Sequence, residues 1–190
     1  MAEAVNTDLL GPFATISSPA DHIAYQLTPA DVLWAARMAQ YEGGTDVAAT
    51  LWTVTQRFVY LHDGMTGTLG HQPTFTEFAR AFSQPINPAW DEPTDAKCIA
   101  NPTRCTDAQL SRRHSAATKP WARLDSRIRA TVLKWAAASL PNPVPRSVDF
   151  ADAAVSQHFL DRNPGAVIIR RPATGTSPRL TACIGTRTAS

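Results

Sequence analysis

The chain has 190 residues, of which 44% are hydrophobic and 18% are charged, and its formal net charge at pH 7 is +2. The hydrophobic fraction is large enough for a packed core and excludes a disordered chain. The small net charge excludes the basic field that drives nucleic-acid binding, and no apolar run approaches the ~20 residues of a membrane-spanning helix. We therefore expect a globular protein with no nucleic-acid partner and no membrane span.

The N-terminal part of the chain shows no regular pattern over residues 1–26, so we expect an irregular segment there, followed by one domain over residues 27–190. The first helix of that domain is predicted to end at Glu42, before two glycines. Thr28 can cap this helix, and Pro29 suits its first position.

A second helix is predicted to start at Thr45 or Asp46, because its apolar residues recur at steps of four and three. These residues are Val47, Leu51, Val54, Phe58 and Leu61. A glycine-containing loop over residues 62–73 follows. The spacing of Thr74 and Glu77 then predicts a capping box that opens a short helix to Phe82.

The rest of the chain alternates loops and short elements. The prolines of the segment 82–90 exclude an α-helix after Phe82, because a proline biases the preceding residue away from helical geometry. The further elements expected are a polar loop over 91–105, helices over 106–118, 125–139 and 149–160, a rigid corner at 141–145, and β-runs at 167–169 and 180–184. The predicted fold class is therefore mainly α with a small β element, that is, α+β.

The three cysteines leave their state open. Cys98 and Cys105 lie in one predicted loop, where a local disulfide is compatible with an oxidising setting. A zinc site built from these two residues and His114 is an alternative that lacks the tight C-x-x-C spacing. Cys183 lies in an apolar run and is expected to be a buried free thiol.

Glu42 is the first candidate for chemistry. A carboxylate in the last turn of an apolar helix lies at the negative end of the helix dipole, and the dipole and burial both raise the pKa expected for it. Such a shift suits a general acid at neutral pH, and the two glycines that follow leave room for a bulky polymer. The alternative interpretation is an ordinary solvated glutamate before a C-capping glycine.

The segment 82–90 is the second candidate. It combines Phe82 and Trp90 with the polar residues Ser83, Gln84 and Asn87 on a stiff backbone. Flat apolar faces beside neutral hydrogen-bonding groups suit the binding of sugars. The alternative is a proline-rich corner whose aromatic residues belong to the core.

Other kinds of site find little support in the sequence. There is no G-x-S-x-G motif and no glycine-rich phosphate loop, and no cysteine starts a helix where its thiolate would be favoured. A cysteine peptidase therefore stays a weak alternative. No metal and no cofactor are expected.

Taken in order, these features resemble the cell-wall hydrolase family of the spore-cortex-lytic type, whose members cleave the glycan strands of peptidoglycan. The segment 36–42 looks like the family's glutamate helix, and 47–51 looks like its second helix. The segment 82–85 is similar to its Gln/Pro/Phe/Ser loop. Residues 142–150 and 182–185 resemble its late Asn-Pro and Ile-Gly motifs, with Asp149 where the family has a histidine.

The resemblance implies a lysozyme-like or transglycosylase-like fold and cleavage of the β-1,4 bond between N-acetylmuramic acid and N-acetylglucosamine. Glu42 would act as the general acid and base, as in a lytic transglycosylase or a muramidase. The expected substrate contacts are Ser83, Gln84, Asn87, Tyr41, Tyr60 and Asp149. A hydrolytic mechanism would add a second carboxylate, for which Asp46, Asp91 and Asp149 are the candidates.

A second hypothesis from a different class is a catalytically inactive lysozyme-like module for binding or assembly, such as a component of a phage tail. The N-terminus has neither a basic segment nor a long apolar segment, so no secretory signal is expected. A virion-borne protein would need none. The expected partners are peptidoglycan and, for a virion component, other tail proteins.

Overall fold

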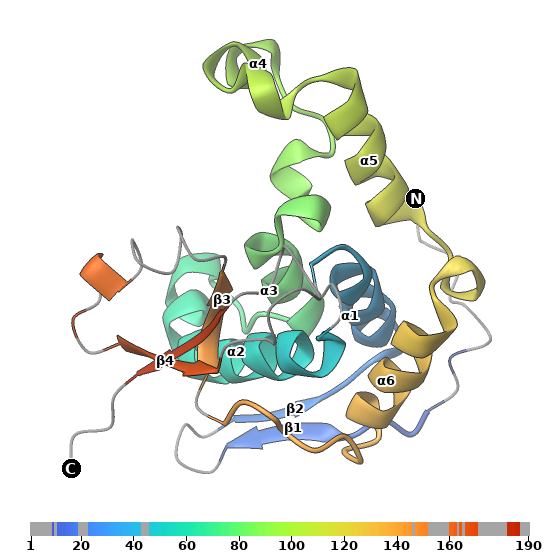
Figure 1. Cartoon of the computed structure of the whole chain (residues 1–190), viewed down its shortest axis with the longest axis vertical. Helices are drawn as coiled ribbons and strands as arrows, with labels where there is room; N and C mark the ends of the chain where they lie inside the picture. Colours follow the sequence, from blue (N-terminus) through green and yellow to red (C-terminus); the bar gives the residue numbers. More distant parts are fainter. Residues whose placement is uncertain are drawn as a thin grey trace.

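The computed structural model describes residues 9, 11–18, 23–42, 46–145, 147–151, 160–162, 164, 166–170 and 182–186. The chain is mainly helical with two small sheets, which confirms the α+β class (Figure 1). The elements are, with η for single 3₁₀ turns, β1 (Thr15–Ser18), β2 (Ile23–Gln26), α1 (Pro29–Glu42), α2 (Val47–Leu69), α3 (Phe75–Phe82), η2 (Gln84–Ile86), η3 (Pro88–Trp90), α4 (Asp95–Ala100), η4 (Pro102–Arg104), α5 (Asp107–Thr118), η5 (Trp121–Arg123), α6 (Ser126–Ala136), β3 (Ser147–Ala151), β4 (Ala166–Arg170) and β5 (Ala182–Thr186).

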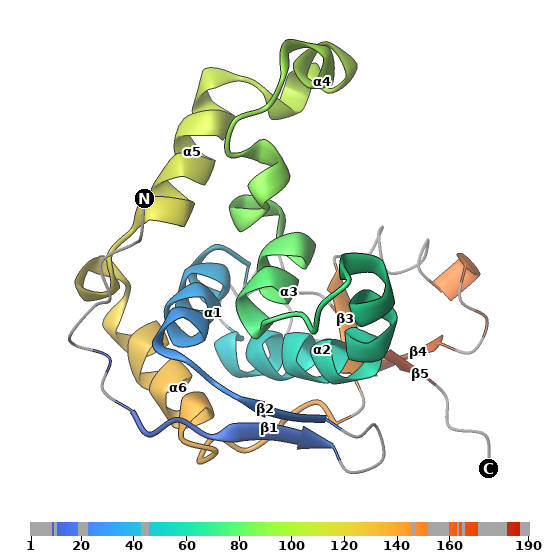
Figure 2. The same ribbon diagram turned by 180° about the vertical axis from the view of Figure 1, so that it is seen from behind.

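The helices α1, α2, α3 and α6 form the body of the molecule, with the β1–β2 hairpin along one end and the second sheet beside α2 (Figures 1 and 2). At the opposite end, α4, η4 and α5 project away from the body. We call this segment, residues 95–118, the arm. Its helix α5 returns to contact η2 and α1.

Both sheets are antiparallel. In the first, β1 pairs with β2 from Thr15 opposite Gln26 to Ser18 opposite Ile23. In the second, β5 lies between β3 and β4, which confirms the two late β-runs. No helix among the described residues has the length and apolar character to cross a membrane.

The core lies between α1, α2, α3 and α6. Leu51, Val54 and Phe58 of the predicted α2 stripe are buried, and Val47 and Leu61 pack at its edge. The ring of Phe58 meets four other rings edge-on, with centroids 5.2–5.6 Å apart; they belong to Tyr25, His62, Phe75 and Phe78. Such edge-to-face packing adds stability beyond the area that it buries.

Several local predictions were wrong. The segment 1–26, expected to be irregular, contains β1 and β2, and Leu9 belongs to the core. Helix α2 continues to Leu69 through the expected loop at 62–73, and the expected loop at 91–105 contains α4 and η4. The helix expected over 149–160 starts instead as β3, because pairing with β5 outweighs local helix propensity. Residues 152–159 lie outside the described residues.

The predicted helix starts are present. Thr74 and Glu77 form the complete capping box of α3, and hydrogen bonding by the Thr74 backbone lowers the pKa of Glu77. Thr106 caps α5 by accepting from the Gln109 N–H, and Asp125 caps α6. The segment 82–90 is not an α-helix; it forms the two 3₁₀ turns η2 and η3, each with a proline at its start.

A buried carboxylate, Asp31, joins three of these elements. Its Oδ2 accepts hydrogen bonds from the Tyr25 hydroxyl at 2.8 Å, and from the backbone N–H and hydroxyl of Thr28 at 2.9 and 2.7 Å. Its Oδ1 accepts from the backbone N–H and hydroxyl of Thr76 at 2.9 and 2.7 Å. Five donors thus satisfy a side chain that is 1% exposed, and they tie β2, α1 and α3 together.

The donors of this network stay protonated. Burial and the negative charge of Asp31 raise the pKa of the Tyr25 hydroxyl well above its usual range. Tyr25 therefore remains a hydrogen-bond donor throughout the physiological pH range.

We predict that Asp31→Asn destabilises the protein by about 3 kcal/mol or more, since an amide nitrogen would face donors where a carboxylate oxygen accepts. For a chain of this size the midpoint of thermal unfolding falls by roughly 10 °C. Asp125→Asn is the matched control, because asparagine caps a helix as well as aspartate does. A midpoint for Asp31→Asn equal to that of the control would contradict the role of the network.

Candidate functional site

The side chains of Glu42 and Ser83 meet at the ends of two helices. Glu42 is the last residue of α1, and Ser83 is the C-cap of α3. The Ser83 hydroxyl donates a hydrogen bond to Glu42 Oε1 at 3.2 Å, across 41 positions of sequence. Ser83 is buried and Glu42 is half-buried, so one oxygen of the carboxyl group is held in a defined place.

This meeting follows from the way α1 and α3 run together. Asp31 and Thr76, in the first turns of the two helices, are hydrogen-bonded, and so are Glu42 and Ser83 at their last residues. The helices therefore point the same way and pack against each other. Both C-terminal ends converge at Glu42, where their partial negative charges add.

The turn that follows Ser83 is fixed by local hydrogen bonds. Asn87 donates from Nδ2 to the Ala81 carbonyl at 2.9 Å, and its Oδ1 accepts from the Ala89 N–H at 2.9 Å. Arg80 donates to the Ile86 carbonyl and forms an ion pair with Asp91 at 2.6 Å. The amide of Asn87 thus holds the backbone of η3 in place.

An aromatic surface lies beside this turn. The ring of Phe82 is 38% exposed and packs on Phe78 with a centroid distance of 4.5 Å. The guanidinium of Arg57, from α2, lies 4.2 Å from the centroid of Phe82. Phe82 and Ser83 are consecutive, so a partly exposed ring adjoins the residue that holds Glu42.

The other predicted contacts are more dispersed. Gln84 is exposed and accepts a hydrogen bond from Arg104 Nη1 at 2.8 Å. The Tyr41 hydroxyl lies 3.4 Å from Ser115 Oγ, on the side of α1 that faces α5. Tyr60 is 64% exposed on α2. Asp149 lies in β3, and the orientation of its side chain is outside the description.

Two of the three candidate second carboxylates have structural roles. Asp46 Oδ1 accepts from the Ala49 N–H at 3.2 Å at the start of α2. Asp91 forms the ion pair with Arg80.

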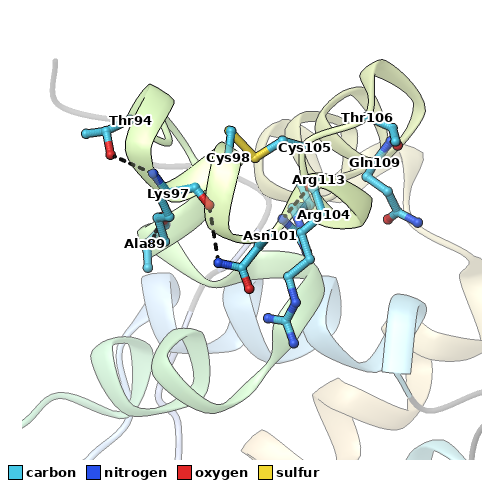
Figure 3. Close-up of a disulfide and its surroundings, with 10 residues drawn as sticks. All are labelled: Ala89, Thr94, Lys97, Cys98, Asn101, Arg104, Cys105, Thr106, Gln109 and Arg113. Carbon is cyan, nitrogen blue, oxygen red and sulfur yellow. Dashed lines mark hydrogen bonds between the residues drawn. A yellow bond between two sulfur atoms is a disulfide. The ribbon is translucent and has the colours of Figure 1, made fainter.

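The arm is closed by a disulfide between Cys98 and Cys105 (Figure 3). Neither sulfur is a thiolate in this state, as the zinc alternative would require. Among the described residues, no group of three or more His, Cys, Asp or Glu side chains is placed to hold a metal ion. The side chain of Cys183, in β5, lies outside the described residues.

The feature that sequence reasoning missed is the group of basic side chains around Trp90. We predicted a single polar loop over 91–105. The cations come instead from three separate elements, α4, η4 and α5. The available signal was the density of basic residues between 97 and 119.

Comparison of the chain with protein-family models, with curated proteins and with solved structures finds no match.

We predict that the double variant Cys98→Ser, Cys105→Ser loosens the arm, because the bridge restricts a short loop whose opening would otherwise be easier by about 2 kcal/mol. Trypsin should cut after Lys97 and Arg104 roughly thirty times faster in the variant, as measured by mass spectrometry after reduction. Cleavage after Lys134, in α6, serves as the internal control. Equal rates at the arm in both proteins would show that the bridge does not hold it.

Proposed function

We propose that the protein cleaves the glycan strands of peptidoglycan at the β-1,4 bond that follows N-acetylmuramic acid, with Glu42 as general acid and base. The observation that carries the proposal is the contact between Glu42 and Ser83. It unites the two segments that the sequence singles out independently, the end of the first helix and the segment 82–90.

The surroundings of Glu42 suit a proton donor. The C-terminal ends of α1 and α3 meet there, so the partial negative charges of two helix ends lie near the carboxyl group. In the proposed mechanism the Ser83 hydroxyl orients the carboxyl group through Oε1, and the proton to be transferred is carried on the other oxygen, Oε2. That oxygen then donates the proton to the glycosidic oxygen as the bond breaks.

A single carboxyl group suffices for the lytic-transglycosylase version of this reaction. After protonating the leaving sugar, the Glu42 carboxylate takes the proton of the C6 hydroxyl of the muramic acid. The C6 oxygen attacks the anomeric carbon and closes an anhydro ring, and Glu42 is protonated again. Hydrolysis would need a second carboxylate at a set spacing; of the candidates, Asp46 accepts a hydrogen bond at the start of α2, and Asp91 pairs with Arg80.

The Phe82 ring, next to Ser83 in sequence, is partly exposed although Arg57 and Phe78 pack against it, and its exposed part offers an apolar contact for a sugar. Gln84, the exposed residue that follows Ser83, offers a neutral amide for an N-acetyl group. A virion component would carry such an enzyme to the wall from outside.

We predict that Glu42→Gln abolishes the lysis of purified peptidoglycan, with a rate loss of about a hundredfold or more, since glutamine cannot transfer a proton. The assay is the fall in turbidity, with circular dichroism to show an unchanged fold. Glu92→Gln, an exposed glutamate near the start of the arm, is the matched control and should keep full activity. Lysis by Glu42→Gln at the rate of the control would disprove the mechanism.

Product masses separate the two versions of the reaction. An anhydro product is one water lighter than a hydrolytic product. Sedimentation of the wild-type protein with peptidoglycan, without release of any fragment, would support the inactive binding module instead.

We predict that Ser83→Ala lowers kcat about tenfold or more on soluble glycan strands and changes KM less than twofold. A hydrogen bond to a charged group is worth about 1.5–3 kcal/mol, and this bond positions the acid rather than the substrate. Ser139→Ala, an exposed serine beyond α6, controls for the loss of a hydroxyl. A rise in KM with kcat unchanged would instead assign Ser83 to substrate binding.

A further inference from the structure

The positive charge of the chain is concentrated in the arm. The arm, residues 95–118, contains four basic side chains and two acidic side chains, a formal net charge of +2. The rest of the chain contains fourteen basic and fourteen acidic side chains and has no formal net charge. The arm, which projects from the body (Figure 1), therefore carries the formal net positive charge of the chain.

Three of these cations surround one tryptophan. Lys97 Nζ lies 4.4 Å from the centroid of the Trp90 ring, and the guanidinium carbons of Arg113 and Arg104 lie 4.9 and 5.4 Å from it. They come from α4, α5 and η4, as Figure 3 shows for the three basic side chains. We call these four residues the Trp90 cluster.

The three cations have only neutral acceptors among the described residues. Lys97 donates to the Ala89 carbonyl, and Arg113 donates to the Arg104 carbonyl at 3.3 Å. Arg104 donates to the Gln84 amide oxygen at 2.8 Å. Three positive charges therefore lie around one ring without a carboxylate partner in the described part of the chain.

Such an arrangement has an electrostatic cost. Burial, together with the positive charges of Arg104 and Arg112, lowers the pKa of Arg113. Contact with the face of Trp90 compensates for part of this repulsion. An anion bound between the cations would relieve it more fully, because guanidinium groups bind oxyanions with paired hydrogen bonds.

The Trp90 cluster connects to the candidate acid through two consecutive residues. Ser83 donates to Glu42, and Gln84 accepts from Arg104. A polymer that lies along Glu42 and η2 would therefore extend towards the arm, where α5 contacts η2. An anion recognised there would be one that the same polymer carries.

We propose that the Trp90 cluster is an anion-binding subsite that takes a carboxylate of the peptide stem attached to the glycan strand at Glu42. This inference rests on the proposed function, because it assumes that the strand is peptidoglycan. A carboxylate and a phosphate would both present an oxyanion on a wall polymer. A carboxylate is preferred to a phosphate because peptide stems are attached to the muramic acid itself, next to the bond that Glu42 would cleave.

The test is calorimetric titration with soluble disaccharide fragments, with and without a peptide stem, in the full chain carrying Glu42→Gln to prevent cleavage. We expect Arg104→Gln and Arg113→Gln each to weaken binding of the peptide-bearing fragment about tenfold. The peptide-free fragment should bind equally to all variants. Arg127→Gln, exposed on α6, removes the same charge elsewhere and should change binding less than twofold.

Two further arms make the outcome decisive. A fragment whose stem carboxylates are amidated should bind the protein with an unaltered cluster weakly. Its affinity should equal that of the Arg104→Gln variant for the acidic fragment. This comparison tests the subsite even where a variant fails to fold. Equal binding of the acidic and amidated fragments would overturn the proposal. Cluster-dependent binding of polyglycerol phosphate, without any effect of the stem, would also overturn it and assign the subsite to a phosphate polymer.

The binding titration is independent of cleavage. Carboxylate-dependent binding by a protein that releases no anhydro or hydrolytic product would retain the subsite and reject the catalytic proposal. Full cleavage activity with no dependence of binding on the stem would do the reverse.

Discussion

The buried carboxylate of Asp31 sets the geometry on which the candidate site depends. It accepts five hydrogen bonds, and those from Thr76 bind the start of α3 to the start of α1. Because the two helices begin at one point and run the same way, their ends also come close, and Glu42 meets Ser83 there. A buried charge is tolerated only where its hydrogen-bonding capacity is filled, so this junction admits little variation in the relative position of the helices.

The sequence predicted features that depend on neighbouring residues. The N-cap at Thr28, the capping box at Thr74 and the buried stripe of α2 are local patterns, and each is present in the structure. The features that were missed depend on distant partners. The strands β1 and β2 are four residues each, with a pattern too short to predict, and they form because each supplies the hydrogen bonds of the other.

The candidate site divides in the same way. Glu42 was identified by its place at a helix end, and Ser83 by its place in a polar and aromatic segment. The sequence could not predict their hydrogen bond, because that bond depends on the junction at Asp31. An aspartate in the first turn of a helix does not indicate in the sequence that it will bind another helix. The Trp90 cluster was missed for a related reason, since its four residues come from η3, α4, η4 and α5 and meet only when these elements pack together.

The turn η2 connects the two chemical regions. Pro85 and the 3₁₀ geometry fix its backbone, in which successive side chains diverge by about a third of a turn. The buried Ser83 is thereby directed to an acid, and the exposed Gln84 to a cation. A rigid turn between them keeps the spacing of acid and cations constant. Such constancy is what a polymer with a regular repeat requires, since a group bound at one region then places the next bond at the other.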